Sequence, residues 1–248
     1  MVDKNKALKE KLSYLKLIHI RDNYTEMTEK AARKKMSNLD FLSEIICEEV
    51  AEKHNRATER RLRRAKIPYR KTLEQFKWTH PDKINRSEIE NIFRLHFIEE
   101  NKNIVFLGRC GTGKTHLATA LAAKACSAGY NTLFSSAVDI INSLTAAKAV
   151  NNFQDKLQKY IKTDLLIIDE LGYLPVDRHG AEILYQIIAG RYERGSIVIT
   201  SNRPYNKWVE IFDNNTIVTS AVLDRIIHHC HTVKIEGSSF RMNERKKS

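Results

Sequence analysis

The first third of the sequence lacks the residues that most often interrupt helices. The 248 residues include nine glycines and four prolines, yet no glycine precedes Gly108 and the first proline is Pro68. Both residue types disfavour helix interiors. Leucine and isoleucine also recur at helical spacing in this region. These features predict one or more helices that run up to Ile67, where the following proline would end them.

Cysteine and long apolar runs are also scarce. The four cysteines lie far apart and form no CxxC pair, which argues against a disulfide framework or zinc ribbon and favours a reducing cytoplasm. No stretch of about 18 residues lacks a charge, so we expect no transmembrane span. The first ten residues contain no apolar segment, so we also expect no secretory signal. Hydrophobic residues still make up 42% of the chain, enough for a packed core.

The chain has a large excess of basic residues. Lysine and arginine number 42 and aspartate and glutamate 30, which gives a formal net charge of +12. Between Lys53 and Lys71 there are nine basic residues and only Glu59 is acidic, so this segment carries +8 of the total. Like charges at helical spacing repel one another, and a phosphate backbone is a partner that relieves this repulsion. Four of the arginines would share one face of a helix: Arg56, Arg60, Arg63 and Arg64.

Two other interpretations of the basic segment stay open. It could be a solvated surface that contacts nothing, or it could lie on anionic lipid. Lipid binding requires an apolar face, which here consists only of Leu62 and Ala65, so we favour nucleic acid. The residues predicted to contact DNA phosphates are Arg56, Arg60, Arg61, Arg63, Arg64 and Lys66.

A phosphate-binding motif follows the first predicted strand. The apolar run Asn103–Leu107 leads into GRCGTGKT at positions 108–115, and a helix-like stretch continues through about Cys126. This is the pattern G-x-x-x-x-G-K-[ST] between a strand and a helix, in which backbone N–H groups and the helix N-terminus hold phosphates. Lys114 would reach the β- and γ-phosphates, and the Thr115 hydroxyl would ligate Mg²⁺. The predicted nucleotide-binding residues of the loop are Gly108, Gly111, Thr112, Gly113, Lys114 and Thr115.

A second predicted strand carries a pair of acids at its carboxyl end. Residues 164–170 read DLLIIDE, with four apolar residues before Asp169 and Glu170. Ligands bind beyond the carboxyl ends of parallel strands. Asp169 would hold Mg²⁺ through its water shell, and Glu170 would orient and activate the attacking water. Loop and acids together indicate hydrolysis of a nucleoside triphosphate.

The predicted sheet has five parallel strands in an α/β fold. The strand at 196–200 ends in a polar tip, where Asn202 would contact the γ-phosphate or the lytic water, although an asparagine before Arg-Pro also suits a turn. The runs at 130–134 and 232–235 complete the sheet.

The order of a phosphate loop, an Asp-Glu strand, a polar strand tip and a late arginine resembles that of AAA+ ATPases. The segments LLIIDELGYLPVD, RYERGSIVITSNRPYNKW, AVLDRIIHHC and KIEGSSFR are similar to those of the IstB-type transposition helper ATPases, sisters of the DnaC-type helicase loaders. The segment RRLRRAKIPYRKTLEQF resembles the start of that family's ATPase domain. Arg109 and Cys110 stand where family members often carry Pro-Pro; these are variable positions, and the essential glycines are kept.

The resemblance implies a P-loop NTPase of AAA+ type. A small all-α domain with the basic helix would span residues 1–70, and the ATPase domain residues 71–248. Arg225 falls where the family places an arginine finger that acts on a neighbouring subunit, so ATP would sit at the interfaces of a homo-oligomer. Arg241 falls at the sensor-2 position. A surface salt bridge is the alternative for either arginine, and rival interface residues are Arg191, Arg194 and Arg203.

The resemblance also implies a function: an ATP- and Mg²⁺-dependent helper that assembles on duplex DNA without reading its sequence, recruits and stimulates a transposase, and is released by hydrolysis. Its expected location is the bacterial cytoplasm, at the nucleoid, with no membrane partner. One alternative is a DnaC-like loader of a replicative helicase that prefers single-stranded DNA. Another is a nucleotide switch that hardly turns over, against which Glu170 argues.

Overall fold

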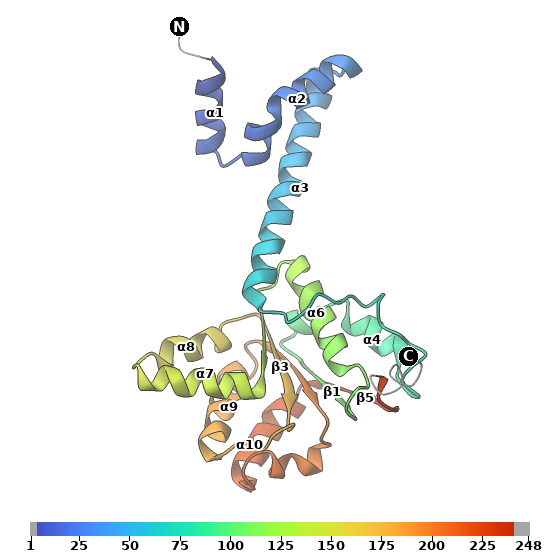
Figure 1. The fold of residues 1–248 in the computed structure, drawn as a ribbon, viewed down its shortest axis with the longest axis vertical. Helices are drawn as coiled ribbons and strands as arrows, with labels where there is room; N and C mark the ends of the chain where they lie inside the picture. The colour runs from blue at the N-terminus through green and yellow to red at the C-terminus, as the bar shows by residue number, and fades with distance from the viewer. Residues whose placement is uncertain (1–3, 241–248) are drawn as a thin grey trace. The chain divides into compact units, whose positions relative to one another are not determined.

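A computed structural model describes residues 4–240 of the chain, which forms two compact units, Met1–Arg60 and Arg61–Ser248 (Figure 1). The division falls inside a long helix, ten residues before the domain boundary predicted from sequence. Each unit is described by itself below.

The first unit is built from helices only. It contains α1 (Lys4–Tyr14), α2 (Ile18–Lys34) and the first part of α3 (Asn38–Ala65). At the start of α3, the Ser37 hydroxyl oxygen accepts a hydrogen bond from the Asp40 N–H at 3.2 Å and donates to the Asp40 carboxylate at 2.6 Å. The Ser37 side chain thus caps an N–H group in the first turn, so the local sequence itself fixes where α3 begins.

A buried carboxylate joins α2 to α3 in the first unit. Glu49 on α3 is 1% exposed and accepts a hydrogen bond from the backbone N–H of Ile20 at 2.9 Å. That N–H belongs to the first turn of α2, where a negative charge is favourable. Arg56 donates to the same carboxylate at 3.0 Å. Arg56 therefore balances a buried charge within its own unit.

The basic segment forms the C-terminal half of α3. The helix ends at Ala65, and Lys66 adopts a left-handed conformation with φ 57°. The predicted helix extends to Ile67, so the observed end comes two residues earlier. Pro68 disfavours a helical conformation in the residue before it, and the left-handed Lys66 has already turned the chain away.

The second unit contains the predicted five-stranded parallel sheet, with strand order β2-β3-β4-β1-β5. Each strand begins and ends within two residues of its predicted bounds. The three central strands, β1, β3 and β4, contain runs of three or four apolar residues, as buried parallel strands require, whereas β2 and β5 at the edges also carry polar residues. The strands are β1 (Asn103–Gly108), β2 (Thr132–Ser136), β3 (Leu165–Leu171), β4 (Ser196–Ser201) and β5 (Cys230–Ile235).

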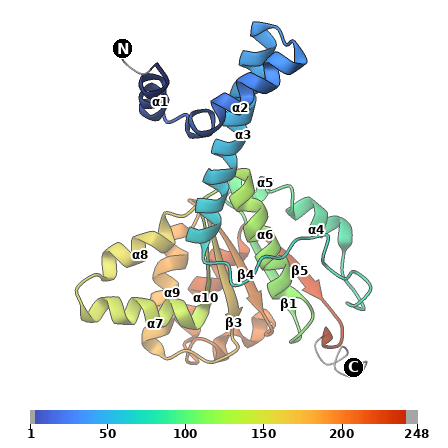
Figure 2. The same ribbon diagram turned by 45° about the horizontal axis from the view of Figure 1, so that its top comes forward.

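Helices cover both faces of this sheet (Figure 2). Along β1, Ile104 and Phe106 belong to one core cluster and Val105 and Leu107 to the other, because successive side chains of a strand point to opposite faces. The first face packs against α4 (Arg86–Ile92), α5 (His96–Glu99) and α6 (Lys114–Ala128). The second packs against α7 (Ala137–Ala149), α8 (Phe153–Ile161), α9 (Arg178–Arg191), a 3₁₀-helix (Tyr205–Glu210) and α10 (Thr216–Ile227). Within residues 4–240, none of the helices has the length and apolar character needed to cross a membrane.

One buried arginine of the second unit joins the end of α8 to the starts of β3 and β4 through hydrogen bonds. Arg191 at the end of α9 is 1% exposed, and burial lowers its pKa to about 10, so the guanidinium stays charged at neutral pH. This position removes Arg191 from the candidate interface arginines. Its two terminal nitrogens donate to carbonyl oxygens at the end of α8 and the starts of β3 and β4: those of Tyr160 (2.8 Å), Ile161 (2.9 Å), Thr163 (2.7 Å), Asp164 (3.1 Å) and Ser196 (2.7 Å).

Candidate nucleotide-binding site

The loop between β1 and α6 has the backbone that its glycines predict. Gly111 (φ 79°) and Gly113 (φ 97°) are left-handed, a conformation that side chains disfavour. Both are also closely covered: a Cβ on Gly111 would lie 2.2 Å from the Ser239 hydroxyl oxygen, and one on Gly113 would lie 2.6 Å from the Phe76 ring. Glycine is therefore required at both positions, first for the left-handed backbone of the loop and second because Ser239 and Phe76 approach the loop too closely for a side chain.

The loop directs positive charge toward a ligand. α6 begins at Lys114 with no side-chain cap and no acidic residue in its first turn, so its first N–H groups remain able to bind an anion. The Lys114 ammonium donates to the carbonyl oxygens of Gly108 at 2.7 Å and Arg109 at 2.8 Å. These bonds hold the predicted phosphate-binding lysine against the loop itself.

The predicted metal-binding residues come together from two elements. The Thr115 hydroxyl, at the start of α6, donates to the Asp169 carboxylate of β3 at 3.0 Å. Asp169 is 6% exposed, so water does not compete freely for this bond. An alcohol and a carboxylate are the oxygen donors that Mg²⁺ prefers, and the sequence motif predicted this pair.

A third residue, Thr200 on the neighbouring strand β4, was not predicted. Its hydroxyl donates to the same Asp169 oxygen at 2.5 Å and accepts a hydrogen bond from the backbone N–H of Glu170 at 2.9 Å. A signal was present, because Thr200 is a polar residue that directly follows the apolar run of β4. Its use became clear only once β4 was placed beside β3.

Glu170 projects away from the strand that carries it. The pairing of β3 with β4 is irregular between Ile168 and Leu171, and Glu170 has φ 58°. Such bulges redirect side chains next to functional sites. The two neighbouring carboxylates therefore have different surroundings. Asp169 is buried among hydroxyl groups, whereas Glu170 is exposed and lines a cavity. These are the separate environments expected of a metal ligand and a water-orienting base.

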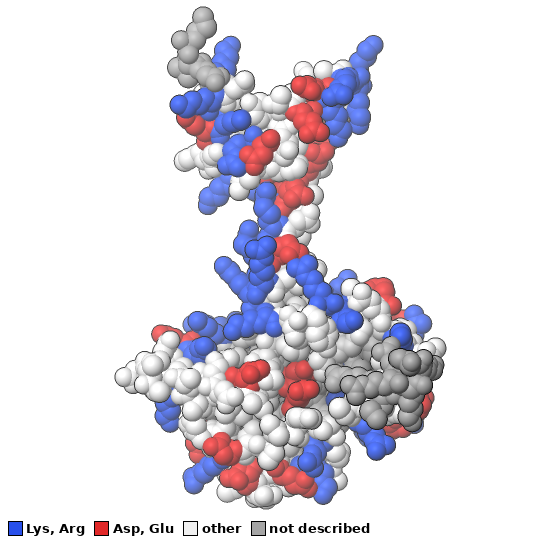
Figure 3. Space-filling model, viewed as in Figure 1, with Lys and Arg blue, Asp and Glu red and all other residues white. Residues whose placement is uncertain are grey.

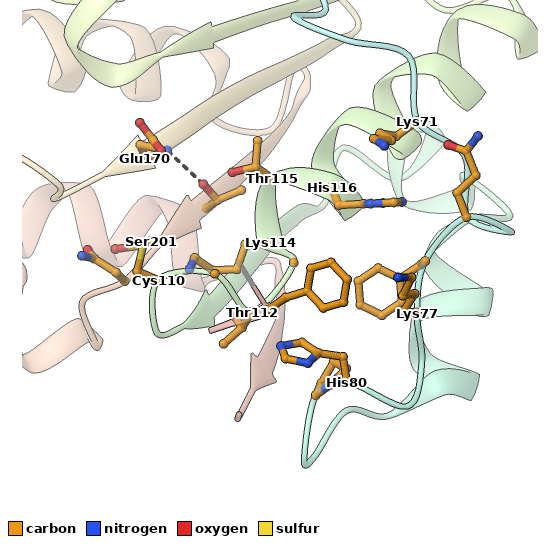
Figure 4. A pocket seen from close by; sticks show the side chains of 18 of the residues that line it. Lys71, Lys77, His80, Cys110, Thr112, Lys114, Thr115, His116, Glu170 and Ser201 are labelled. Atoms are coloured by element: carbon orange, nitrogen blue, oxygen red, sulfur yellow. Dashed lines mark hydrogen bonds between the residues drawn. The ribbon is translucent and has the colours of Figure 1, made fainter. Parts of the chain in front are cut away.

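The cavity has a volume of about 710 Å³ and is lined by the loop, the ends of β3 and β4, and residues 69–81. Figure 4 shows Lys114 and Thr115 between two walls, with Glu170 and Ser201 on one side and Lys77 and His80 on the other. Asn202, which directly follows β4, also lines the cavity. The volume is in the range of small-molecule and cofactor sites.

The wall formed by residues 69–81 was missed by sequence reasoning. Phe76 packs edge-on against Trp78 (centroids 5.0 Å apart) and against His116 of α6 (5.4 Å). The His116 ring hydrogen-bonds the Thr72 carbonyl oxygen at 2.9 Å. Trp78 therefore contributes packing to this wall. The only signal for a wall was a local concentration of aromatic and basic residues without periodicity.

The end of the described chain covers the loop. The Phe240 N–H donates to the Gly111 carbonyl oxygen at 3.0 Å, and the His80 ring packs edge-on against Phe240 with centroids 4.7 Å apart. The His80 ring also contacts the Ser238 carbonyl oxygen at 3.0 Å. Arg241, predicted at the sensor-2 position, follows immediately and lies outside the described residues.

The other predicted arginines lie away from this cavity. Arg225 on α10 donates to the Ala221 carbonyl oxygen at 2.8 Å, and its guanidinium lies 5.3 Å from the centre of the Tyr185 ring. It is not among the residues that line the cavity of its own chain. Arg203 pairs with Glu210 at 3.0 Å. The predicted DNA-contacting residues other than Arg56 cluster where α3 ends, a strongly basic region in Figure 3.

A parallel sheet with a phosphate loop after β1, an acid pair on β3 and a polar tip on β4 defines a P-loop protein of the AAA+ type. The family model for IstB-like ATP binding proteins matches residues 10–248. The chain therefore belongs to the family of IstB-like ATP binding proteins, and the resemblance of its motifs is confirmed.

Relatives and solved structures agree with this assignment. A Pseudomonas aeruginosa protein named for ATP binding in insertion sequence IS21 is 38% identical over 96% of this chain and 89% of its own length. One from Geobacillus stearothermophilus, named for insertion sequence IS5376, is 36% identical over 91% and 89%. The crystal structure of DnaI has a TM-score of 0.58 at 18% identity, covering 67% of this chain and 91% of that one. The DnaC helicase loader has a TM-score of 0.53 at 22% identity, covering 66% and 96%. At these identities the structures show the fold, which confirms the predicted α/β fold around a parallel sheet.

Proposed function

We propose that this protein is an Mg²⁺-dependent ATPase that helps a transposase to act on duplex DNA. The observation that carries the ATPase part is the hydrogen-bonded set of Thr115, Asp169 and Thr200, with Glu170 exposed beside it. The insertion-sequence names of the relatives support the transposition part.

Each residue of the site has a distinct task in ATP hydrolysis. The loop N–H groups and Lys114 bind the β- and γ-phosphates, for which Lys114 exchanges its two carbonyl partners. Thr115 and Asp169 would hold Mg²⁺, which neutralises charge that develops on the phosphate oxygens. Glu170 orients and deprotonates the attacking water, and Asn202 contacts the γ-phosphate or that water.

The arginines extend this site across subunits. Arg225 lines no part of its own chain's cavity, as expected of a finger that acts in a neighbour's site, and Arg241 would contact phosphates of its own or a neighbouring subunit. ATP would then lie between the subunits of a homo-oligomer. The basic end of α3 binds DNA phosphates without reading sequence, and hydrolysis releases the assembly from DNA and transposase in the bacterial cytoplasm, at the nucleoid.

The ATPase assignment is tested with Glu170→Gln, which keeps the size of the side chain and removes its ability to accept a proton. We expect the variant to bind ATP like the parent and to hydrolyse it about 10²–10⁴-fold more slowly, the usual contribution of a general base. Phosphate release is measured with and without duplex DNA. A parent protein no faster than the variant would disprove the enzyme assignment.

The client is tested separately, because a DnaC-like helicase loader could use the same ATPase. Immobilised protein with bound ATP is exposed in parallel to the transposase of the same insertion sequence and to the replicative helicase. Retention of the transposase alone is the expected result. Retention of the helicase alone, with a preference for single-stranded DNA, would establish the alternative function.

A further inference from the structure

A second cavity of the second unit lies where the last turn of α3, the edge strand β2 and α8 meet, and its volume is about 320 Å³. Five of the residues that line it are basic, and none is acidic. They come from two parts of the chain: Arg61, Arg64 and Lys66 at the end of α3, and Lys156 and Lys159 on α8. We call this cavity the basic groove.

One cation in the basic groove is incompletely paired. Arg61 is half-buried, and its terminal nitrogen Nη1 is shielded from solvent without a hydrogen-bond partner. In the part of the chain that the structure describes, only one other buried side-chain nitrogen or oxygen lacks a partner, the Nε of Arg191. A buried guanidinium N–H without an acceptor is unfavourable. An anion in the groove would supply the acceptor.

The charges of the groove match an extended polyanion better than a small ion. Five like charges around one cavity repel one another, and no lining carboxylate reduces that repulsion. A free phosphate carries about two negative charges at most, fewer than the groove can neutralise. A nucleic-acid backbone presents successive phosphates along a line, which suits cations contributed by separate elements.

We propose that the basic groove binds phosphates of the duplex backbone, with Lys156 and Lys159 as contacts that continue the basic face of α3 onto α8. The proposal rests on the proposed DNA-binding function and adds a site to it. Lysine and arginine heads that contact phosphates fix the position of DNA and read no base sequence. The two lysines escaped sequence analysis because they lie about ninety residues beyond the basic segment.

The test uses the double variant Lys156→Glu/Lys159→Glu. The matched control is Arg94→Glu/Lys234→Glu, which reverses the same number of charges at two exposed positions, one of them on β5 at the opposite edge of the sheet. Affinity for a fluorescein-labelled duplex is measured with ATP over a series of salt concentrations. We expect at least about tenfold weaker binding, and a slope of log affinity against log salt reduced by about 1.8, or 0.9 for each lost phosphate contact. The control should bind like the parent.

A second measurement does not depend on the variants. Lysines of the parent protein are acetylated with and without duplex DNA, and the modified sites are identified by mass spectrometry. DNA should protect Lys156 and Lys159 and leave Lys234 reactive. Protection by inorganic pyrophosphate but not by DNA would assign the groove to a small anion and overturn the proposal.

The outcomes separate this proposal from the function it rests on. If the parent binds duplex DNA, and the groove variant binds it as well as the control does, the groove is not a DNA site, while the DNA-binding function stands. If the parent does not bind duplex DNA, both are wrong. Circular dichroism checks that the variants fold, and Lys156→Gln/Lys159→Gln replaces the charge reversal if it prevents folding.

Discussion

Replacing Arg191 should destabilise the second unit, Arg61–Ser248, more than replacing any surface arginine would. Its guanidinium forms five hydrogen bonds to carbonyl oxygens, and bonds to a charged group each contribute about 1.5–3 kcal/mol. Burying the charge costs several kcal/mol, which offsets part of that sum. Arg191→Ala leaves these carbonyl oxygens without a donor, and each buried acceptor left unsatisfied costs about 1–3 kcal/mol, so the net loss is about 3–5 kcal/mol. We therefore expect Arg191→Ala to lower the free energy of unfolding by about this amount.

Arg191→Lys keeps the positive charge but offers fewer N–H donors, so its stability should lie between those of the parent and Arg191→Ala. A lysine ammonium has three N–H donors, so at least two of the five carbonyl oxygens lose their bond, and we expect a loss of about 2 kcal/mol. Arg194→Ala, an exposed residue three positions later, is the matched control and should change stability by less than about 0.5 kcal/mol.

Urea unfolding followed by tryptophan fluorescence measures these changes in the relevant unit. Both tryptophans, Trp78 and Trp208, belong to residues 61–248, and Trp208 is fully buried. Their fluorescence therefore follows unfolding of the second unit alone. Equal midpoints for Arg191→Ala and Arg194→Ala would refute the structural role assigned to the guanidinium.

Three further predictions concern the site and the basic segment. Thr200→Val should lower kcat for ATP hydrolysis about tenfold or more with a smaller change in KM, because loss of a hydrogen bond worth about 1–3 kcal/mol leaves Asp169 and Glu170 less firmly held. Thr200→Ser keeps the hydroxyl and should restore kcat, and a normal kcat in the valine variant would contradict the role given to Thr200. N-ethylmaleimide should modify the exposed Cys110, which lines the cavity, and thereby block nucleotide binding. ATP should protect the thiol, and the variant Cys110→Ser should be insensitive to the reagent. Burial raises the pKa of the Cys126 and Cys230 thiols, so these react more slowly. Charge reversal at four positions should abolish duplex binding and leave ATP binding intact, and loss of ATP binding would show that the two functions share residues. The four positions are Arg60, Arg61, Arg63 and Arg64.

The sheet and the phosphate loop were predictable because each is encoded locally. The central strands contain runs of three or four apolar residues, and the loop is a contiguous motif whose glycines are needed for its left-handed backbone conformation. Thr115 and Asp169 followed from the motifs as well. The two lie 54 positions apart, and their 3.0 Å hydrogen bond is a consequence of β1 and β3 belonging to one parallel sheet.

The unpredicted parts depend on contacts between distant segments. Thr200 acquires its role only from the pairing of β4 with β3, and Phe76 only from its packing over Gly113. Arg191 was counted among the interface candidates from the sequence, and this was wrong for a different reason. Arginine is rarely fully buried, and nothing near position 191 in the sequence indicates five carbonyl oxygens converging from two other segments.

The arginines of α3 show why a count of charges does not measure a binding surface. Arg56 belongs to the most basic segment of the chain, yet it contacts a buried glutamate that in turn accepts from the first turn of α2. Its charge is balanced inside the first unit, and its removal would leave Glu49 buried without a cation. Arg61, five residues later on the same helix, has a shielded nitrogen without an acceptor. The electrostatic attraction available to an external polyanion is therefore set by which cations lack an internal partner, and in α3 that property changes within five residues.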